Sequence, residues 1–207
     1  MTSKLKILIA DDHAILRVGL STLLNTFDDF EVVGEAENGP ATLRKVRKLK
    51  PDVVILDLMM PDMDGVETTR RLIQDDPDVR ILILTTFGTS DGISHALDAG
   101  ARGAILKNAE IEELATAIRT VARGERYVSR ELERIMEEDP PVRELTPRQL
   151  EILGSLVRGL TSVDIARELD ISPDMVREHT SALFKRIGAA NRTEAVAIAL
   201  RKHLLKI

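Results

Sequence analysis

Five polar residues in the first half of the chain each stand directly after a short apolar run, namely Asp11, Asp12, Asp57, Thr85 and Lys107. If these runs are parallel strands, all five residues lie at the carboxyl edge of one sheet, where ligands bind in the crevice. Side chains that are far apart in the sequence would then converge on one small site. That site would hold three carboxylates, a hydroxyl and an ammonium group.

Three carboxylates at close range repel one another unless a cation joins them. Oxygen ligands without imidazole or thiolate suit Mg²⁺, which takes one or two carboxylates and keeps several waters. The Asp57 carboxylate, fixed at a strand end, can attack a phosphoryl group, while Mg²⁺ and the Lys107 ammonium neutralise the charge on that group. The Thr85 hydroxyl would donate to a phosphoryl oxygen. Asp12 alone could equally be a helix N-cap, but the five positions together favour a phosphoryl-transfer site.

The segments that must position these residues alternate between two periodicities. Apolar runs of strand length occupy residues 6–10, 31–36, 53–56, 81–84 and 103–106. Segments with helical spacing of apolar residues lie between and after them, at 15–26, 40–49, 66–75, 91–99 and 110–123. The runs at 53–56 and 81–84 are apolar throughout, as in strands covered on both faces. Five strand–helix repeats predict an α/β domain over residues 1–124, with a doubly wound, five-stranded parallel sheet.

Residues 125–144 are predicted to connect this domain to a second one. Ser129–Glu137 could form a short helix, and the following Glu-Asp-Pro-Pro combines charge with two prolines, which is typical of a linker. Residues 145–207 then carry four helix start signals and predict an all-α, four-helix domain. These signals are a capping box at Thr146–Gln149, a similar start at Thr161, and N-cap residues at Ser172 and Asn191.

The predicted helix Ser172–Ile187 has two chemically different faces. Its core face would be formed by Val176, Thr180, Leu183 and Ile187. The opposite face carries side chains that form hydrogen bonds, namely Asp174, Arg177, Glu178, Ser181 and Lys185. With the helix before it, this segment has the spacing of a helix-turn-helix, and such a face can enter the major groove of DNA. For an isolated helix, a merely solvated face would explain the pattern better.

Composition limits the classes of function. The chain contains no Cys, which excludes disulfides, thiolate metal sites and Cys nucleophiles. Residues 1–123 carry 15 Lys and Arg against 20 Asp and Glu, a net charge of −5, whereas residues 145–207 carry 10 against 7, a net charge of +3. This asymmetry is compatible with a nucleic-acid-binding module at the C-terminal end. Neither a signal peptide nor an apolar run of membrane-spanning length is present, so the cytoplasm is the expected location.

Four segments of the first domain resemble the signature segments of response-regulator receiver domains: LKILIADD from Leu5, DLMMPDMDG from Asp57, ILILTT from Ile81 and ARGAILK from Ala101. The resemblance implies a flavodoxin-like receiver in which Asp57 accepts a phosphoryl group from a histidine of a sensor kinase. Asp12, Asp57 and the Met59 carbonyl would bind Mg²⁺ directly, and Asp11 would act through water. Thr85 and Lys107 would complete the site. Such a protein is not an enzyme, apart from slow self-dephosphorylation.

Two positions depart from the receiver pattern. The family often has an aromatic residue three positions before the lysine, and here that residue is Ala104. A proline often follows the lysine, and here that residue is Asn108, which could serve as a helix N-cap. The usual coupled movement of a threonine and an aromatic ring is therefore not expected. The histidines His13 and His95 lack a partner pattern and are interpreted as surface or packing residues.

Residues Leu145–Ala197 resemble the LuxR-type helix-turn-helix, so the chain as a whole resembles NarL/FixJ-family response regulators. The resemblance implies that Arg177, Glu178 and Ser181 lie where family members contact bases. It also implies that a second group lies near phosphates, namely Arg148, Ser172, His179, Lys185 and the backbone at Ser162. Glu178 would repel phosphate unless it accepts a hydrogen bond from a cytosine amine. Met175 replaces a threonine that is common in the family, and Ser181 is shorter than the basic residue of some members.

One module with few basic contacts should bind DNA weakly, so a homodimer on two half-sites is expected for the active form. The last helix, with Ala195, Ile198, Ala199 and Leu205, is the candidate interface by resemblance, although packing within its own domain explains part of the same stripe. Expected partners are a sensor histidine kinase, double-stranded DNA and, as a further candidate, RNA polymerase.

Two alternative functions remain open at this stage. An aspartyl-phosphate phosphatase would need a second acid two residues after the nucleophile, and here that residue is Met59. A regulator that uses the receiver only as a dimerisation platform, without phosphorylation, is compatible with Ala104 and Asn108.

Overall fold

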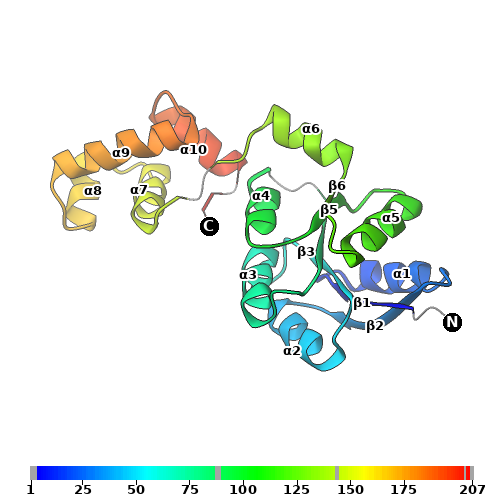
Figure 1. The fold of residues 1–207 in the computed structure, drawn as a ribbon. Coiled ribbons are helices and arrows are strands. Elements are labelled where there is room, and N and C mark those ends of the chain that lie inside the picture. Colours follow the sequence, from blue (N-terminus) through cyan, green and yellow to red (C-terminus); the bar gives the residue numbers. More distant parts are fainter. Residues whose placement is uncertain (1–3, 87–89, 143–144, 203, 206–207) are drawn as a thin grey trace. The chain divides into compact units, whose positions relative to one another are not determined.

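The computed structural model describes residues 4–86, 90–142, 145–202 and 204–205. The chain forms two compact units, Met1–Asp139 and Pro140–Ile207 (Figure 1). Within the described part of the chain, no helix combines the length and the apolar character that crossing a membrane requires.

The first unit is built on one parallel sheet. Its strands are β1 (Leu5–Ala10), β2 (Phe30–Ala36), β3 (Val53–Asp57), β4 (Ile81–Thr85), β5 (Gly103–Leu106) and β6 (Tyr127–Val128). They lie in the order β2-β1-β3-β4-β5-β6, and each pairs in parallel with its neighbour. The predicted doubly wound α/β sheet is therefore confirmed, with six strands in place of five. The sixth strand has only two residues, too few for an alternating pattern to be recognised in the sequence.

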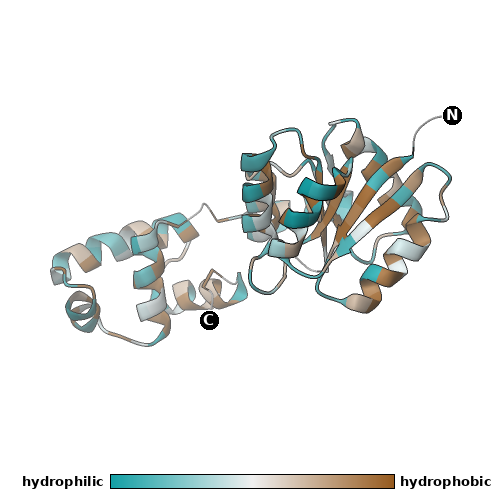
Figure 2. Ribbon diagram, turned by 90° about the horizontal axis from the view of Figure 1, so that it is seen from below, coloured by the Kyte–Doolittle hydropathy of each residue, from teal (hydrophilic) through white to brown (hydrophobic). Residues whose placement is uncertain are grey.

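Helices cover both faces of this sheet. α1 (Ala14–Leu24) and α5 (Ile111–Ala122) pack with one set of strand side chains, which includes Ile7, Ile9 and Leu84. α2 (Gly39–Leu49), α3 (Gly65–Asp75) and α4 (Ser90–Asp98) pack with the other set, which includes Leu8 and Ile83. Every residue of β3 and β4 is buried, as expected for central parallel strands, and the strands are mostly brown in Figure 2. The two layers hold the ends of β1, β3, β4 and β5 rigidly.

The segment after α5 continues the first unit. The Tyr127 and Ser129 amides donate to the carbonyls of Arg102 and Ala104 at 3.0 and 3.1 Å, which adds β6 to the sheet. α6 (Arg130–Glu138) follows, and its Leu132 is fully buried in the same core cluster as Ala104. The first unit thus extends to Asp139, beyond residue 124 where the strand–helix pattern ends, because β6 and α6 pack onto β5 and α4.

Tyr127 provides a test of this packing by pH titration, since it is the only tyrosine in the chain. Burial, and then the hydrogen bond that its hydroxyl donates to Glu113 at 3.0 Å, raise the pKa of Tyr127 from 10.0 to about 12. Absorbance at 295 nm should therefore show ionisation near pH 12 in the folded protein and near 10 in urea. The free energy of unfolding should fall as the pH rises from 10 to 12, because only the unfolded chain loses this proton readily. Glu113→Gln should lower the folded-state midpoint; an unchanged midpoint would refute the role of Glu113.

The start of α3 and the end of β3 approach each other so closely that only a glycine, which has no side chain, fits at position 65. A Cβ atom at this position would lie 2.4 Å from the Asp57 carbonyl oxygen and 2.7 Å from Leu58 Cα, and these backbone atoms cannot move aside easily. We expect Gly65→Ala to lower the free energy of unfolding by about 1–3 kcal/mol, measured by urea denaturation. Gly19→Ala in α1 is the matched control. Nothing lies within 4 Å of a Cβ there, so this change should stabilise by up to about 1 kcal/mol. Equal stability of both variants would contradict the clash.

The second unit contains α7 (Pro147–Val157), α8 (Ser162–Glu168), α9 (Pro173–Ile187) and α10 (Arg192–Arg201). The predicted start signals are confirmed: Thr146 and Thr161 form capping boxes, and the side chains of Ser172 and Asn191 accept from the amides of Met175 and Glu194. One apolar core joins the four helices. On α9 this core takes Val176, Leu183 and Ile187, whereas Thr180 is only partly buried.

Candidate functional site

The polar residues predicted to converge do so at the carboxyl edge of the sheet. Lys107 Nζ lies 2.6 Å from Asp11 Oδ2 and 2.9 Å from Asp57 Oδ2, so one ammonium group bridges two carboxylates. Asp11, Asp57 and Thr85 are 1–3% exposed. The Lys107 amide donates to the Thr85 carbonyl at 2.7 Å, which fixes the ends of β4 and β5 beside each other. The site is therefore a nearly dry cluster on rigid strand ends.

Burial and charge have opposite effects on the ionisation of this cluster. Burial raises the pKa of Asp57 above its usual value, and the hydrogen bond from Lys107 reverses only part of this shift. For Lys107, burial alone would lower the pKa, but the hydrogen bonds to Asp11 and Asp57 outweigh it, so the net shift is upward. Lys107 therefore stays a cation, and it stabilises two carboxylates that would otherwise repel each other in a medium of low polarity.

Two further side chains organise the loop after β1, and the sequence interpretation assigned neither of them to the site. The Nδ1 atom of His13 lies 2.7 Å from Asp12 Oδ1 and 3.1 Å from Asp11 Oδ1. The Arg17 guanidinium donates to the Asp11 carbonyl at 2.6 Å. His13 is also the N-cap residue of α1, so Asp12 is not that cap. The only signal for His13 was its position directly after two acidic residues.

The cluster has the donor set of a divalent-cation site. Oxygen atoms of Asp11, Asp12 and Asp57 and the His13 ring nitrogen all lie within 4.8 Å of one another. Hard carboxylate oxygens fit Mg²⁺. Asp12 and Met59 are exposed, so this side of the cluster is open to solvent, while the Met59 amide donates to the Asp57 carboxylate. A cation and a phosphoryl group could therefore reach Asp57 from the same side.

The two positions that depart from the receiver pattern lie in different environments. Ala104 is fully buried in the core cluster that also contains Leu132 of α6. Asn108 is exposed, and the N-cap of α5 is Glu110, so the expectation that Asn108 caps this helix was wrong.

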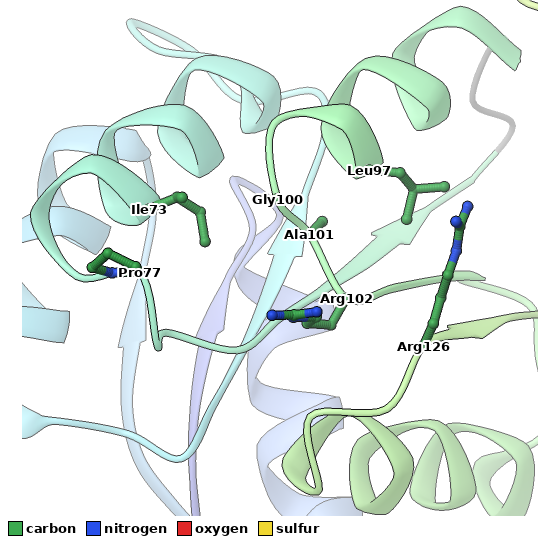
Figure 3. Close-up of a pocket in the computed structure, with 7 residues that line it drawn as sticks. All are labelled: Ile73, Pro77, Leu97, Gly100, Ala101, Arg102 and Arg126. Carbon is green, nitrogen blue, oxygen red and sulfur yellow. The ribbon is translucent and has the colours of Figure 1, made fainter.

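A pocket of about 300 Å³ lies apart from the carboxylates, against the loops that enter β4 and β5. Its lining is Ile73, Pro77, Leu97, Gly100, Ala101, Arg102 and Arg126 (Figure 3). Most of these residues are apolar, and the two arginines precede β5 and β6. The lining includes no carboxylate and no nucleophilic side chain, so this pocket is not part of the acidic cluster at the opposite edge of the sheet.

The exposed face of α9 carries the side chains predicted to contact bases. Arg177, Glu178, Ser181 and Lys185 are exposed, and Arg177 donates to Asp174 one turn earlier on the helix. Among the predicted phosphate neighbours, Ser172 is engaged as the N-cap of α9, while His179 and Ser162 are half-buried. Arg148 donates to Glu151 within α7 at 2.8 Å and to the Leu169 carbonyl at 3.0 Å, and the second bond ties α7 to the end of α8.

Comparison with known proteins agrees with both parts of this geometry. Residues 7–119 match the model of the response regulator receiver domain. Residues 143–199 match the model of bacterial regulatory proteins of the luxR family. The chain is a response regulator of the NarL/FixJ family. The predicted receiver and LuxR-type helix-turn-helix are thus confirmed, as is the broader function of DNA-binding transcription regulation in a two-component system.

Similar proteins cover nearly the full length of this response regulator. It is 38% identical to the oxygen regulatory protein NreC of Staphylococcus epidermidis, over 98% of this chain and 100% of NreC. It is 35% identical to the response regulator protein VraR of Staphylococcus aureus, over 98% and 99% of the two chains. A structure of two RcsB dimers bound to two parallel DNAs superposes with a TM-score of 0.69, at 25% identity, over 97% of this chain and 99% of that one.

Arg177 allows a direct test of whether the exposed face of α9 binds DNA. An arginine that binds a guanine edge with two hydrogen bonds contributes about 1–3 kcal/mol of discrimination against other bases. We therefore expect Arg177→Ala to weaken binding to a selected site by about 5- to 150-fold, with little change on random DNA, measured by fluorescence anisotropy. Arg186→Ala, an exposed arginine in the last turn of the same helix, is the control and should lose much less. Equal losses on selected and random DNA would mean that Arg177 contacts only phosphate.

Proposed function

We propose that this response regulator is switched by transfer of a phosphoryl group from a histidine of a sensor kinase to Asp57. One Asp57 carboxylate oxygen would form the new O–P bond as the donor's P–N bond breaks, and the electron pair would leave with the imidazole. The observation that carries this proposal is the buried cluster of Asp57, Asp11 and Lys107, with Lys107 Nζ 2.9 Å from the nucleophilic carboxylate. A cation already in contact with the nucleophile can stabilise the charge that the phosphoryl group brings.

Mg²⁺ fits the same cluster. Asp12, Asp57 and the Met59 carbonyl would bind it directly and Asp11 through water, and the bound ion would neutralise charge on the phosphoryl oxygens. His13 contacts both Asp11 and Asp12, and its ring is exposed, so it can turn away when a cation binds. Thr85 and Lys107 would then contact the phosphoryl group after transfer. Thr85 is buried beside this site, and it is the last residue of β4.

We further propose that α9 binds duplex DNA through Arg177, Glu178 and Ser181, with Lys185 and His179 near phosphates. The exposure of the first three residues on one helix supports this assignment. Arg148, Ser172 and the backbone at Ser162 would also lie near phosphates, and these residues stand at the starts of α7, α9 and α8. The RcsB dimers on DNA support a homodimer as the active form.

The decisive experiment measures DNA affinity with and without a phosphodonor. Wild-type protein, acetyl phosphate and Mg²⁺ would be combined with a DNA site selected from a random pool, and the Kd would be compared with that of untreated protein. We expect phosphorylation to change the Kd by a factor typical of allosteric coupling, about 5- to 150-fold. The spacing and symmetry of the selected site would report the dimer geometry. A protein that is phosphorylated without any change in Kd would contradict the proposed switch.

A further inference from the structure

The pocket of the first unit lies at the amino edge of the sheet, where the chain enters β4, β5 and β6. Its walls include the half-buried side chains of Ile73 in α3 and Leu97 in α4, and both pack against the core of the unit. Its volume of about 300 Å³ is at the lower end of the range for small-molecule sites. Such sites combine an apolar lining with a few polar groups. Here the charged groups are Arg102 and Arg126, and Arg126 extends toward Leu97 (Figure 3).

The pairing of β5 with β6 places the two arginines side by side on the backbone. Gly103 and Tyr127 are register partners in these parallel strands, and Arg102 and Arg126 directly precede them. Neighbouring strands lie about 4.8 Å apart. Because successive side chains of a strand alternate between its faces, both arginines belong to the face of Ala104, which is the face that α3 and α4 cover. The sheet therefore holds two cationic side chains next to each other at the pocket.

The charges of these two arginines are not compensated within the described part of the chain. Neither guanidinium forms an ion pair or a hydrogen bond with a described residue, and the pocket lining contains no carboxylate. Asp76 and Asp78 flank Pro77 in the sequence, but the Asp76 carboxylate accepts the Asp78 amide at 3.0 Å. Two like charges on adjacent strands repel each other, and an anion bound between them removes this repulsion.

The loop between α4 and β5 gives the pocket a defined shape. The Gly100 amide donates to the Leu97 carbonyl at 3.0 Å, at the end of α4. Gly100 has a φ of +115°, which favours glycine, and a Cβ at this position would lie 2.8 Å from Ile73 Cγ1. The absence of a side chain at Gly100 thus leaves the space that the pocket occupies. A pocket that exists before its ligand arrives lowers the cost of binding.

We propose that this pocket binds a small organic carboxylate. The apolar body of the ligand would contact Ile73 and Leu97, and its carboxylate would accept hydrogen bonds from Arg102 and Arg126. Both arginine side chains are exposed, so they can turn toward one ligand at the mouth of the pocket. A guanidinium group suits this anion, because it can donate two parallel hydrogen bonds to the two carboxylate oxygens. This site is separate from Asp57 and does not depend on phosphoryl transfer.

The alternative is that both arginines only cover the apolar walls. Long cationic side chains often lay their methylene groups along apolar surface while the charged end stays in water. An apolar ligand would then enter the pocket regardless of its charge. The two explanations therefore differ in one measurable respect, because only an anion site distinguishes a carboxylate from the neutral amide of nearly the same shape.

The test compares phenylacetate with phenylacetamide as probes of the full-length protein at low ionic strength. Isothermal titration calorimetry should show one phenylacetate bound per chain, about 10-fold more tightly than phenylacetamide, as expected for charge-assisted hydrogen bonds. Inorganic phosphate, which has no apolar body, should bind more weakly than phenylacetate. In NMR spectra, phenylacetate should shift the methyl resonances of Ile73 and Leu97 but not that of Met59, which lies beside the acidic cluster. Equal Kd values for the carboxylate and the amide, or no shift of the two pocket methyl resonances, would overturn the proposal.

Three substitutions show whether the two arginines are responsible for anion binding. Arg102→Gln and Arg126→Gln should each raise the Kd for phenylacetate by about 3- to 10-fold, a modest effect because both side chains are exposed. Arg44→Gln is the matched control, since Arg44 is an exposed arginine of α2 outside the pocket lining, and it should change this Kd by less than about 2-fold. Equal losses in all three variants, with each protein folded by circular dichroism, would also overturn the proposal. None of these measurements involves a phosphodonor or DNA, so their failure would leave the proposed function intact.

Discussion

Asp57→Asn is expected to abolish phosphoryl labelling by acetyl phosphate with Mg²⁺, from one group per chain to none. The amide of asparagine lacks the anionic oxygen that attacks phosphorus. Intact-protein mass spectrometry would measure the added mass. Labelling of the variant to the wild-type level would disprove the assignment of Asp57.

The same variant should keep its fold, and this separates loss of chemistry from loss of structure. Burial raises the pKa of Asp57, so the ionised form is less favourable in the folded protein than in the unfolded one. Replacing it with a neutral amide removes that penalty, while Lys107 keeps its contact with Asp11 at 2.6 Å. The free energy of unfolding at pH 7 should therefore be unchanged or higher, by urea denaturation. A clearly lower value would mean that the Lys107–Asp57 pair stabilises the fold by more than burial costs.

The convergence of Asp11, Asp57, Thr85 and Lys107 could be predicted because each residue follows a strand, and parallel strands present their carboxyl ends at one edge. The backbone alone fixes that relation. By contrast, the contacts of His13 and Arg17 with the loop after β1 depend on side-chain rotamers in a loop and on the first turn of a helix. Neither periodicity nor position specifies a rotamer. These contacts could therefore be found only in the structure.

The segment after α5 shows a second limit of sequence patterns. β6 has two residues, and α6 has a single fully buried side chain, Leu132, so neither produces a long periodic signal. Their stability comes from tertiary contacts with β5 and α4, which lie much earlier in the sequence. Arg148 shows the same dependence: its hydrogen bond to the Leu169 carbonyl, which joins α7 to the end of α8, follows from the tertiary structure and has no pattern in the sequence. Long-range packing decides both cases.

Lys107→Met is expected to destabilise the protein strongly, in contrast to Asp57→Asn. Removing one partner of a buried ion pair leaves uncompensated charge and typically costs about 3–5 kcal/mol. Here the variant leaves Asp11 and Asp57, 1% and 3% exposed, without their shared cation. We expect a loss of about 3–5 kcal/mol in the free energy of unfolding at pH 7 in EDTA, by urea denaturation. Lys48→Met, at an exposed position in the last turn of α2, is the control and should change stability by less than about 0.5 kcal/mol.

Two further measurements identify the cause of that loss. If repulsion between the carboxylates is responsible, Mg²⁺ should stabilise Lys107→Met more than the wild type, because a second cation replaces the missing ammonium. The double variant Lys107→Met with Asp57→Asn should be more stable than Lys107→Met alone, since only one buried carboxylate then remains uncompensated. If neither Mg²⁺ nor the second substitution restores stability, the loss comes from the packing of the Lys107 side chain and not from its charge. Restoration by both would show that the Lys107 ammonium group maintains the charge balance of the cluster formed with Asp11 and Asp57.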